Sequence, residues 1–234
     1  MTANLQISGT GHSGYPGNLT DRAYALSVTE DKLLMHFEHL GSSRRVARNA
    51  PVFVEGEKSN CWFTVVSGTV RLFKILSDGR RHIVDFYFPG ECFGMDRLAR
   101  RVFSAEAVTD VTLIRFSKSA TEAIIDESPD LARRVREKLL NDIATVQLRN
   151  LQLGQLKAPE RVAAFLLDVC GRCHLSQAVE LSMPRIDIAD YLGLTIETVC
   201  RVLTTLKRKG TIAAPNPHQI ELRDRPTLTL LAEA

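Results

Sequence analysis

The chain has 234 residues, of which 24% are charged and 44% are hydrophobic. This composition is typical of a soluble globular protein that is long enough to form two separately packed cores. No run of about 18 apolar residues occurs, which excludes a membrane-spanning helix, and the N-terminal residues lack the pattern of a secretory signal. Lys and Arg number 30 and Asp and Glu 27, so the net charge of +3 neither demands nor excludes a nucleic-acid partner.

The five cysteines are an odd number and are scattered along a sequence without an export signal. This favours reduced thiols in the cytoplasm over a disulfide framework. Cys170 and Cys173 alone have the spacing of metal ligands, and no second pair completes the four ligands that a structural zinc site needs. We therefore expect two buried or half-buried thiols at the end of a helix, and no metal site.

Residues 1–26 are polar and glycine-rich, and we predict a flexible tail there. The glycines of Gly9–Gly14 match the dinucleotide-binding fingerprint, but no helix begins after them, so we interpret the match as chance. Ser27–Glu30 reads as a capping box that begins a helix ending at Gly41.

Residues 44–117 contain short β-branched and aromatic runs separated by turn signals. Ser77–Gly79 is typical of a hairpin and Phe88–Gly90 of another turn. The predicted strands are 51–56, 62–68, 69–76 and 83–88, with one or two more in 105–116. Turns at intervals of about 8–12 residues predict a β-sandwich or barrel.

From residue 117 the period becomes helical, and a heptad pattern runs from Leu131 to about Leu156. Its a and d positions are Leu139, Ile143, Val146, Asn150 and Leu153. Such a pattern predicts pairing with a second helix, and an Asn at an a position favours a dimer. The alternative is a helix packed on its own domain, but the run is longer than an ordinary globular helix, which favours dimerisation.

Residues 184–210 predict two helices joined by a tight turn. The first spans Arg185–Leu192 and ends at Gly193. The second is capped by Thr195, spans Ile196–Lys209 and stops at Gly210. This is the pattern of a helix-turn-helix, and it follows a helix over Arg161–Val169 that belongs to the same second domain.

The second of these helices has one apolar and one polar face. The inward residues are Val199, Val202, Leu203 and Leu206, and the outward residues are Glu197, Thr198, Cys200, Arg201 and Thr204. Residues 196–210 carry four basic groups against Glu197, a charge of +3 that equals the net charge of the whole chain. A solvated face is the plainer interpretation, but two strands over 211–214 and 219–222 add a wing and favour DNA binding.

A β-domain, a coiled-coil helix and a winged helix-turn-helix in this order resemble the CRP/FNR superfamily of bacterial transcription regulators, over about residues 30–225. The strings Ile186–Thr195 and Glu197–Val199 with Arg201 are similar to the FixK-type branch. The resemblance implies an α+β fold: an N-terminal β-roll within 27–117, a dimerisation helix within 118–157 and a winged helix-turn-helix within 158–234.

The resemblance also implies a homodimer that reads a palindrome of TTGA-type halves. Glu197 and Arg201 lie one helical turn apart, so Arg201 can fork onto guanine and Glu197 can accept from cytosine N4. The neighbouring base-reading candidates are Ile196, Thr198 and Cys200, where the FNR-like pattern has serine in place of Cys200. Arg185 and Thr195 stand where the family contacts phosphates.

Three effectors occur in the superfamily, and each requires residues that can be sought in this sequence. Cyclic-nucleotide binders carry a glutamate and an arginine where this chain has Met95 and Ser104, so a cyclic phosphate would meet no guanidinium. Residues 1–60 contain no cysteine, which excludes the N-terminal iron–sulfur cluster of FNR. For haem, His36, His39 and His82 give no specific signal. We expect no cofactor, as in FixK-like relatives that are active without a small ligand.

The leading hypothesis is therefore a cytoplasmic transcription activator of microoxic or anaerobic respiration genes that contacts promoter DNA and RNA polymerase. Oxidation of Cys200 would add negative charge on the DNA-facing surface, so Cys200 is a candidate redox site. The alternative is a regulator gated by an unidentified small molecule or haem in the β-roll. No catalytic motif appears, which speaks against an enzyme.

Overall fold

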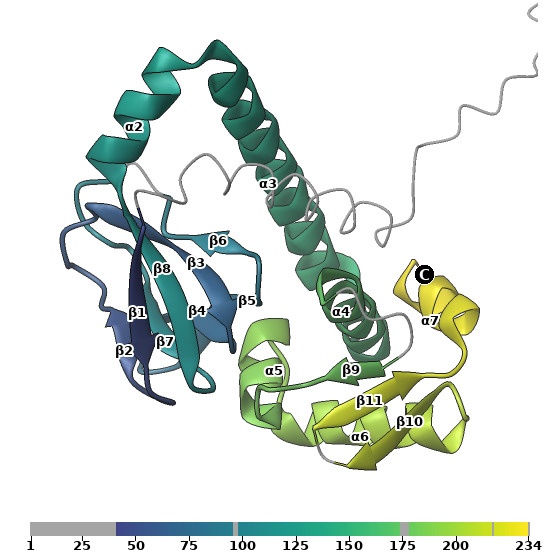
Figure 1. The fold of residues 1–234 in the computed structure, drawn as a ribbon. Coiled ribbons are helices and arrows are strands. Elements are labelled where there is room, and N and C mark those ends of the chain that lie inside the picture. Colours follow the sequence, from purple (N-terminus) through teal and green to yellow (C-terminus); the bar gives the residue numbers. More distant parts are fainter. Residues whose placement is uncertain (1–40, 96–97, 174–177, 217, 234) are drawn as a thin grey trace, which may run out of the picture.

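The computed structural model describes residues 41–95, 98–173, 178–216 and 218–233 (Figure 1). The predicted tail, the glycine match at Gly9–Gly14, the helix predicted before Gly41, and His36 and His39 lie outside the described residues. The fold is mixed α+β, as predicted: a β-rich N-terminal domain, long helices and a C-terminal helix-turn-helix follow one another along the chain.

Eight strands form the N-terminal β-roll as two antiparallel sheets, in the orders β1-β8-β3-β6 and β2-β7-β4-β5. The strands are β1 (Ser42–Val46), β2 (Pro51–Phe53), β3 (Cys61–Ser67), β4 (Val70–Ile75), β5 (Arg81–Tyr87), β6 (Cys92–Phe93), β7 (Ser104–Ala107) and β8 (Val111–Ser117). Buried side chains from both sheets meet between them. The ring centroid of Phe53 in one sheet lies 5.9 Å from that of Phe63 and 6.1 Å from that of Phe93 in the other, so aromatic contacts join the sheets.

The predicted turns of the roll are confirmed. Gly79 and Gly90 have φ of 83° and 91°, a backbone region that favours glycine over residues with a Cβ. The predicted strands are present within two residues of their expected bounds, except that the strand predicted over 51–56 ends three residues early, at Phe53. β1 and β6 were not predicted, because β1 is largely exposed and polar and β6 has two residues.

The segment 118–157, expected to form one dimerisation helix, contains two. α2 spans Lys118–Glu127 and α3 spans Pro129–Gln155. The break follows from Pro129, which lacks a backbone N–H and therefore suits the first turn of a new helix. Trp62 of β3 donates to the Thr121 hydroxyl at 3.0 Å, which fixes α2 on the roll.

The C-terminal domain is a winged helix-turn-helix. Its elements are α4 (Ala158–Arg172), β9 (Ala178–Glu180), α5 (Arg185–Leu192), α6 (Ile196–Arg208), β10 (Ile212–Asn216), β11 (Gln219–Leu222) and α7 (Arg225–Ala232). Gly193 has φ of 63° and ends α5 in the left-handed conformation, as predicted. The wing is a three-stranded sheet in the order β10-β11-β9; β9 and α7 were not predicted.

One apolar core extends from the roll into the winged domain. Ile83, Phe86 and Phe88 of the roll belong to the same buried cluster as Phe165 of α4 and Tyr191 of α5. In Figure 1, α5 lies beside β5, and α6 lies beyond α5 at the lower edge of the molecule. The roll therefore supports the helix-turn-helix directly. Among the described helices, none is both long and apolar enough to cross a bilayer.

Candidate nucleic-acid interface

α6 has the two faces expected of a recognition helix. Val199, Val202 and Leu206 are buried against the domain, whereas Glu197 and Arg201 are exposed. Cys200 and Thr204 are exposed beside them, and Thr198 is half-buried. The exposed face is therefore mainly polar, with Ile196 also exposed at its start, and the opposite face packs against the domain with Leu203 half-buried.

Thr195 caps α6 as predicted. Its hydroxyl oxygen accepts from the backbone N–H of Thr198 at 3.2 Å, which satisfies one of the unpaired donors of the first turn. The Thr198 hydroxyl lies 3.4 Å from Arg201 Nη2, which donates to it. The cap and the half-buried Thr198 thus tether the guanidinium on the exposed face.

Glu197 stands one turn before Arg201. Hydrogen bonds from its own backbone N–H and from the Thr195 side chain lower the pKa of Glu197. The side chain is consequently an anionic acceptor at neutral pH, the form that accepts from cytosine N4. Glu197 and Arg201 together offer an acceptor and a forked donor on one helical face.

Arg185 and Cys200 lie in a groove of about 410 Å³ between α6 and the wing. Burial lowers the pKa of the half-buried Arg185, and the nearby Cys200 partly opposes this shift. Lys207 Nζ donates to the backbone oxygen of Ala214 at 3.3 Å, which ties α6 to β10. Arg185 therefore lies beside the exposed face of α6 that carries Glu197 and Arg201, here called the reading face. The sequence predicts a phosphate contact for Arg185, which is half-buried.

A stripe of large apolar side chains is exposed along α3. Leu139, Ile143 and Val146 are 44%, 54% and 53% exposed. Asn150 is exposed at the next a position, and Leu153 is half-buried. The structure thus places the five predicted dimerisation residues on one helix, with the apolar side chains of the first three turned to solvent in a single copy.

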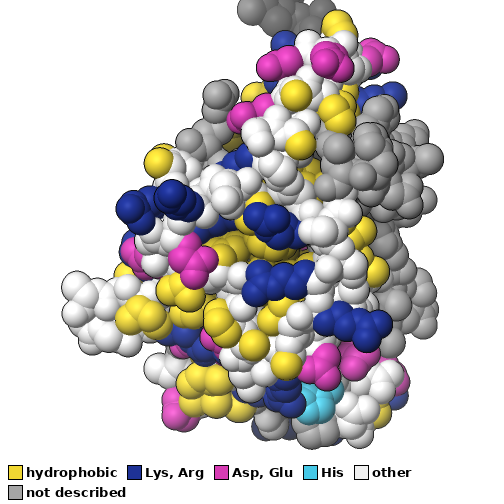
Figure 2. Space-filling model, turned by 60° about the vertical axis from the view of Figure 1, so that its left-hand side comes forward, with side chains coloured by type: hydrophobic (Ala, Val, Ile, Leu, Met, Phe, Trp, Pro, Cys, Tyr) yellow, Lys and Arg dark blue, Asp and Glu magenta, His cyan; other side chains and the backbone are white. Residues whose placement is uncertain are grey.

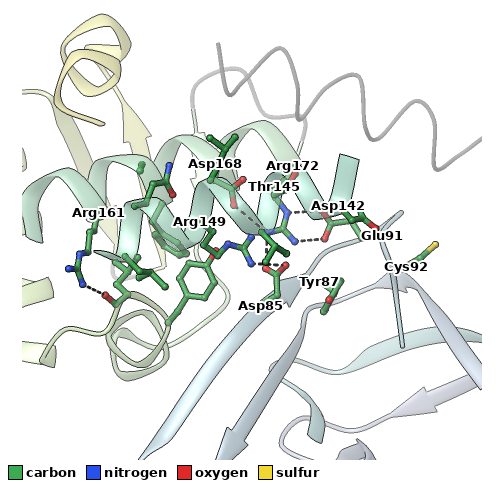
Figure 3. Close-up of a pocket in the computed structure, with 18 of the residues that line it drawn as sticks. Asp85, Tyr87, Glu91, Cys92, Asp142, Thr145, Arg149, Arg161, Asp168 and Arg172 are labelled. Carbon is green, nitrogen blue, oxygen red and sulfur yellow. Dashed lines mark hydrogen bonds and ion pairs between the residues drawn. The ribbon is translucent and has the colours of Figure 1, made fainter. Parts of the chain in front are cut away.

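Two clusters of ion pairs join the roll to the helices. In the first, the carboxylate of Asp187 on α5 is 1% exposed and pairs with Arg71 of β4 at 2.6 Å and with Arg81 of β5. In the second, Asp85 of β5 pairs with Arg149 of α3 at 3.0 Å and with Arg172 of α4 at 3.1 Å. Figure 3 shows both arginines pointing at Asp85 from their two helices.

The protonation of Asp85 is set by these neighbours. Burial would raise the pKa of Asp85, but the guanidiniums of Arg149 and Arg172 outweigh this effect and lower it. Arg172 also pairs with Glu91 at 2.7 Å, and the Arg149 guanidinium lies over the Tyr191 ring at 5.1 Å. One roll carboxylate thereby holds α3 and α4 together.

Neither cluster is predicted from the sequence. Their partners are separated by more than 100 residues for Asp187 and by 64 or more for Asp85, so no local spacing reveals them. One signal was available: in Arg185–Leu192, Asp187 shares a face with the apolar Tyr191, and a carboxylate on a buried helical face needs a partner.

The two cysteines at the end of α4 are a buried and a half-buried thiol, as predicted. Burial raises the pKa of Cys170, and burial together with Glu91 raises the pKa of Cys173 to about 12. Both thiols are therefore protonated at neutral pH.

Two sequence profiles match the chain. Residues 43–128 match the cyclic nucleotide-binding domain, and residues 160–231 match the Crp-like helix-turn-helix domain. The nitrogen fixation regulation protein FixK of Bradyrhizobium diazoefficiens is 42% identical over 184 residues, which cover 77% of this chain and 78% of that protein. The chain belongs to the CRP/FNR family of transcription regulators. It is a DNA-binding transcription activator of the FixK/FNR type and not an enzyme.

Further relatives of this CRP/FNR regulator agree. The transcriptional activatory protein AadR of Rhodopseudomonas palustris is 35% identical and matches over 85% of this chain and 84% of its own. The structure of FixK2 from Bradyrhizobium japonicum superposes with a TM-score of 0.79 at 34% identity, covering 83% of this chain and 98% of that one.

The roll of this CRP/FNR regulator is filled beside Gly94. Arg101 is 3% exposed; its Nη1 donates to the Gly94 oxygen at 2.8 Å, and its guanidinium lies 4.2 Å from the centroid of the Phe53 ring. A Cβ at Gly94 would lie 2.9 Å from that Nη1. Ser104, where nucleotide binders carry arginine, accepts from the Glu55 backbone N–H at 3.0 Å.

Proposed function

We propose that two copies of the chain bind a palindrome of TTGA-type halves, each copy placing α6 in a major groove. The observation that carries this proposal is the exposed pair Glu197 and Arg201, fixed by the Thr195 cap on a helix whose back is buried. Arg201 reads guanine and Glu197 reads cytosine, with Ile196, Thr198 and Cys200 beside them. Thr195 and Arg185 contact phosphates and position the helix.

Dimerisation takes place along α3. Covering Leu139, Ile143 and Val146 with the same stripe of a second copy removes exposed apolar surface from water, and Asn150 pairs across the axis and fixes the register. The two-fold axis then sets the α6 helices about one DNA turn apart.

The proposed regulator acts in the cytoplasm and activates genes for microoxic or anaerobic respiration by contacting promoter DNA and RNA polymerase. The names of the relatives, nitrogen fixation regulation protein FixK and transcriptional activatory protein AadR, support the role of an activator. It works without a cyclic nucleotide or an iron–sulfur cluster. Met95 and Ser104 at the nucleotide positions, and the buried Arg101 beside Gly94, support independence from a cyclic nucleotide. The lack of cysteine in residues 1–60 supports independence from an N-terminal iron–sulfur cluster.

Cys200 is proposed as a point of redox control. The thiol is exposed on the reading face, next to Arg201. Two equivalents of peroxide convert it to a sulfinic acid and water, and the resulting anion opposes DNA phosphate. Peroxide is expected to lower the DNA affinity of the wild type and to spare Cys200→Ser. Equal loss in both proteins would refute control through this thiol.

A second candidate function, gating by a small molecule, is favoured by a cavity of about 250 Å³ between the roll, α3, α4 and α5 (Figure 3). Tyr87, Thr145 and Gln152 line it together with the Asp85 cluster. A ligand there would touch the roll, α3 and the winged domain. DNA affinity that rises when small metabolites from cell extract are added would support this function over the ligand-independent one.

The leading proposal is tested by fluorescence titration of a TTGA palindrome with the wild type and with Arg201→Ala. We expect Arg201→Ala to cost about 1–3 kcal/mol per half-site and to relax specificity at one base pair. Arg133→Ala, an exposed arginine on α3, serves as a control for loss of one positive charge. Equal affinity of wild type and Arg201→Ala would contradict the assignment.

A further inference from the structure

The contact between the helix-turn-helix and the roll is centred on one buried carboxylate. Both oxygens of Asp187 are used: Oδ2 accepts from Arg71 Nη1 at 2.6 Å, and Oδ1 accepts from Arg81 Nη2. Arg81 also pairs with Asp190 of α5 at 2.8 Å. A carboxylate that accepts from two separate strands is held in direction as well as in position.

The rest of the contact is packed and hydrogen-bonded. The ring centroids of Phe86 on β5 and Tyr191 on α5 lie 5.4 Å apart. The Ser182 hydroxyl donates to the Thr69 hydroxyl oxygen of the roll at 2.8 Å. Such a mixed interface, with its charges paired, fixes one relative placement of two packed units better than apolar contact alone.

The covalent connection between α3 and the winged domain is short and not helical. α3 ends at Gln155 and α4 begins at Ala158, with Leu156 extended between them. Arg161 donates to the Leu156 oxygen at 2.8 Å and to the Leu192 oxygen at 3.0 Å, which links this hinge to the end of α5. The angle between α3 and α6 therefore depends on three contacts: the two hydrogen bonds of Arg161 and the ion pairs of Asp187 with the roll.

The contact leaves the reading face open. Asp187, Asp190 and Tyr191 belong to α5, whereas Glu197 and Arg201 on α6 remain exposed while the ion pairs are formed. A contact that blocked DNA would cover α6. This one holds the helix-turn-helix from behind.

We infer that Asp187, Arg71 and Arg81 are positioning residues that set the distance between half-sites accepted by the dimer. The inference rests on the proposed function, because it needs two copies reading a palindrome. One added base pair turns a half-site by about one-tenth of a helical turn and moves it about 3.4 Å. A rigid pair of α6 helices rejects that displacement, whereas a loosened winged domain adapts to it.

The test measures affinity for palindromes whose halves are identical and whose spacers differ by one base pair. Asp187→Asn removes the buried charge without changing shape, and Arg81→Glu on β5 turns two attractions into repulsions. Arg80→Glu is the matched control: it makes the same charge change at the adjacent residue, which pairs with Asp78 within its own hairpin. Spacer selectivity is the ratio of two affinities, so partial unfolding that lowers the active fraction leaves it unchanged.

We expect the wild type and Arg80→Glu to prefer the best spacer by roughly tenfold or more over its one-base-pair neighbours. Asp187→Asn should narrow that ratio to about threefold, and Arg81→Glu should narrow it further, while the preference for TTGA over a changed half-site stays as in the wild type. If Asp187→Asn does not fold, the partly exposed Arg81 position still gives the result.

An unchanged spacer ratio in both variants overturns the inference, and so does tighter binding of the matched site, because the contact would then restrain the domain instead of presenting it. These results leave the proposed function standing if the wild type still prefers the palindrome. A wild type with no preference between a palindrome and a scrambled duplex contradicts the proposed function itself.

Discussion

At the residue scale, one buried and one half-buried carboxylate carry the contacts between the roll and the helices. Asp85 lies between two arginines that come from different helices, and Asp187 lies between two that come from adjacent strands. Removing one partner of such a pair leaves charges without compensation in a poorly hydrated site. These residues are therefore more sensitive to substitution than the exposed ion pairs on α3.

The acid behaviour of Asp85 follows from its lowered pKa. Its folded-state pKa lies below the ordinary value of 3.8, so the stabilisation by the ionised group is complete above pH 3.8 and is lost as the pH falls through the folded-state pKa. We expect Asp85→Asn to lower the free energy of unfolding by about 2–3 kcal/mol at pH 7, measured by urea denaturation. The difference from wild type should shrink below pH 3.8.

Asp78→Asn is the control for this prediction. Asp78 is exposed on the hairpin between β4 and β5 and pairs only locally with Arg80. Its substitution should leave the free energy of unfolding nearly unchanged, because water screens this exposed pair. A similarly small effect for Asp85→Asn at pH 7 would show that the cluster does not stabilise the fold.

At the element scale, the sequence located what depends on local patterns. The bounds of α5 agree with the expected Arg185–Leu192, because a glycine, a cap and a helical period coincide there. α2 and α3 were expected as one element, because the period is helical on both sides of Pro129 and the heptad pattern begins only after it. The wing strand β9 was not predicted, because it has three residues, too few to show a period, and pairs with the distant strand β11.

The candidate site divides in the same way. Glu197, Arg201 and Thr195 could be predicted, since one helix places them together. The exposed face of α3 could be predicted from its heptads. The pairing of Arg71 with Asp187 could not, because it depends on how the roll and the winged domain pack across 116 residues of chain.

The stripe on α3 gives a prediction about assembly. Ile143→Glu puts a charge in the middle of the proposed dimer contact, where it would be buried without a partner. We expect the dimer dissociation constant to rise about 100-fold, a cost of about 2–3 kcal/mol, measured by sedimentation equilibrium.

Asn141→Glu is the matched control for this substitution. Asn141 is exposed on α3 and lies at the heptad position opposite the stripe. It should leave the dissociation constant within about twofold. A wild type that is monomeric at micromolar concentration, or an Ile143→Glu protein that dimerises normally, would contradict assembly through α3.

At the scale of the whole molecule, charge is unevenly distributed. Residues 196–210 have four basic groups and one acidic group, a net +3. Residues 118–130, where α2 meets α3, have one basic group, Lys118, against four acidic groups, a net −3. Figure 2 shows several acidic side chains gathered at the top of the molecule and several basic side chains across its middle. A polyanion therefore attracts the α6 end and repels the opposite corner.

This asymmetry predicts steep and separable salt effects. Affinity for the palindrome should fall linearly with salt on logarithmic axes, with a slope near −0.9 for each phosphate neutralised. Arg208→Ala, near the end of α6, should reduce the slope by about one per copy and keep the sequence preference, whereas Arg201→Ala should reduce the preference. Fluorescence titrations at several salt concentrations measure both. Loss of preference in Arg208→Ala would contradict this division of roles.

The measurement that most directly tests recognition by a pair of α6 helices is a titration of labelled TTGA palindrome and of a duplex with both halves scrambled, at about 150 mM salt, with the mass of the complex determined by sedimentation. We predict two chains on one duplex and a preference of roughly 1,000-fold for the palindrome. A single chain on the duplex, bound equally well to both sequences, would contradict it.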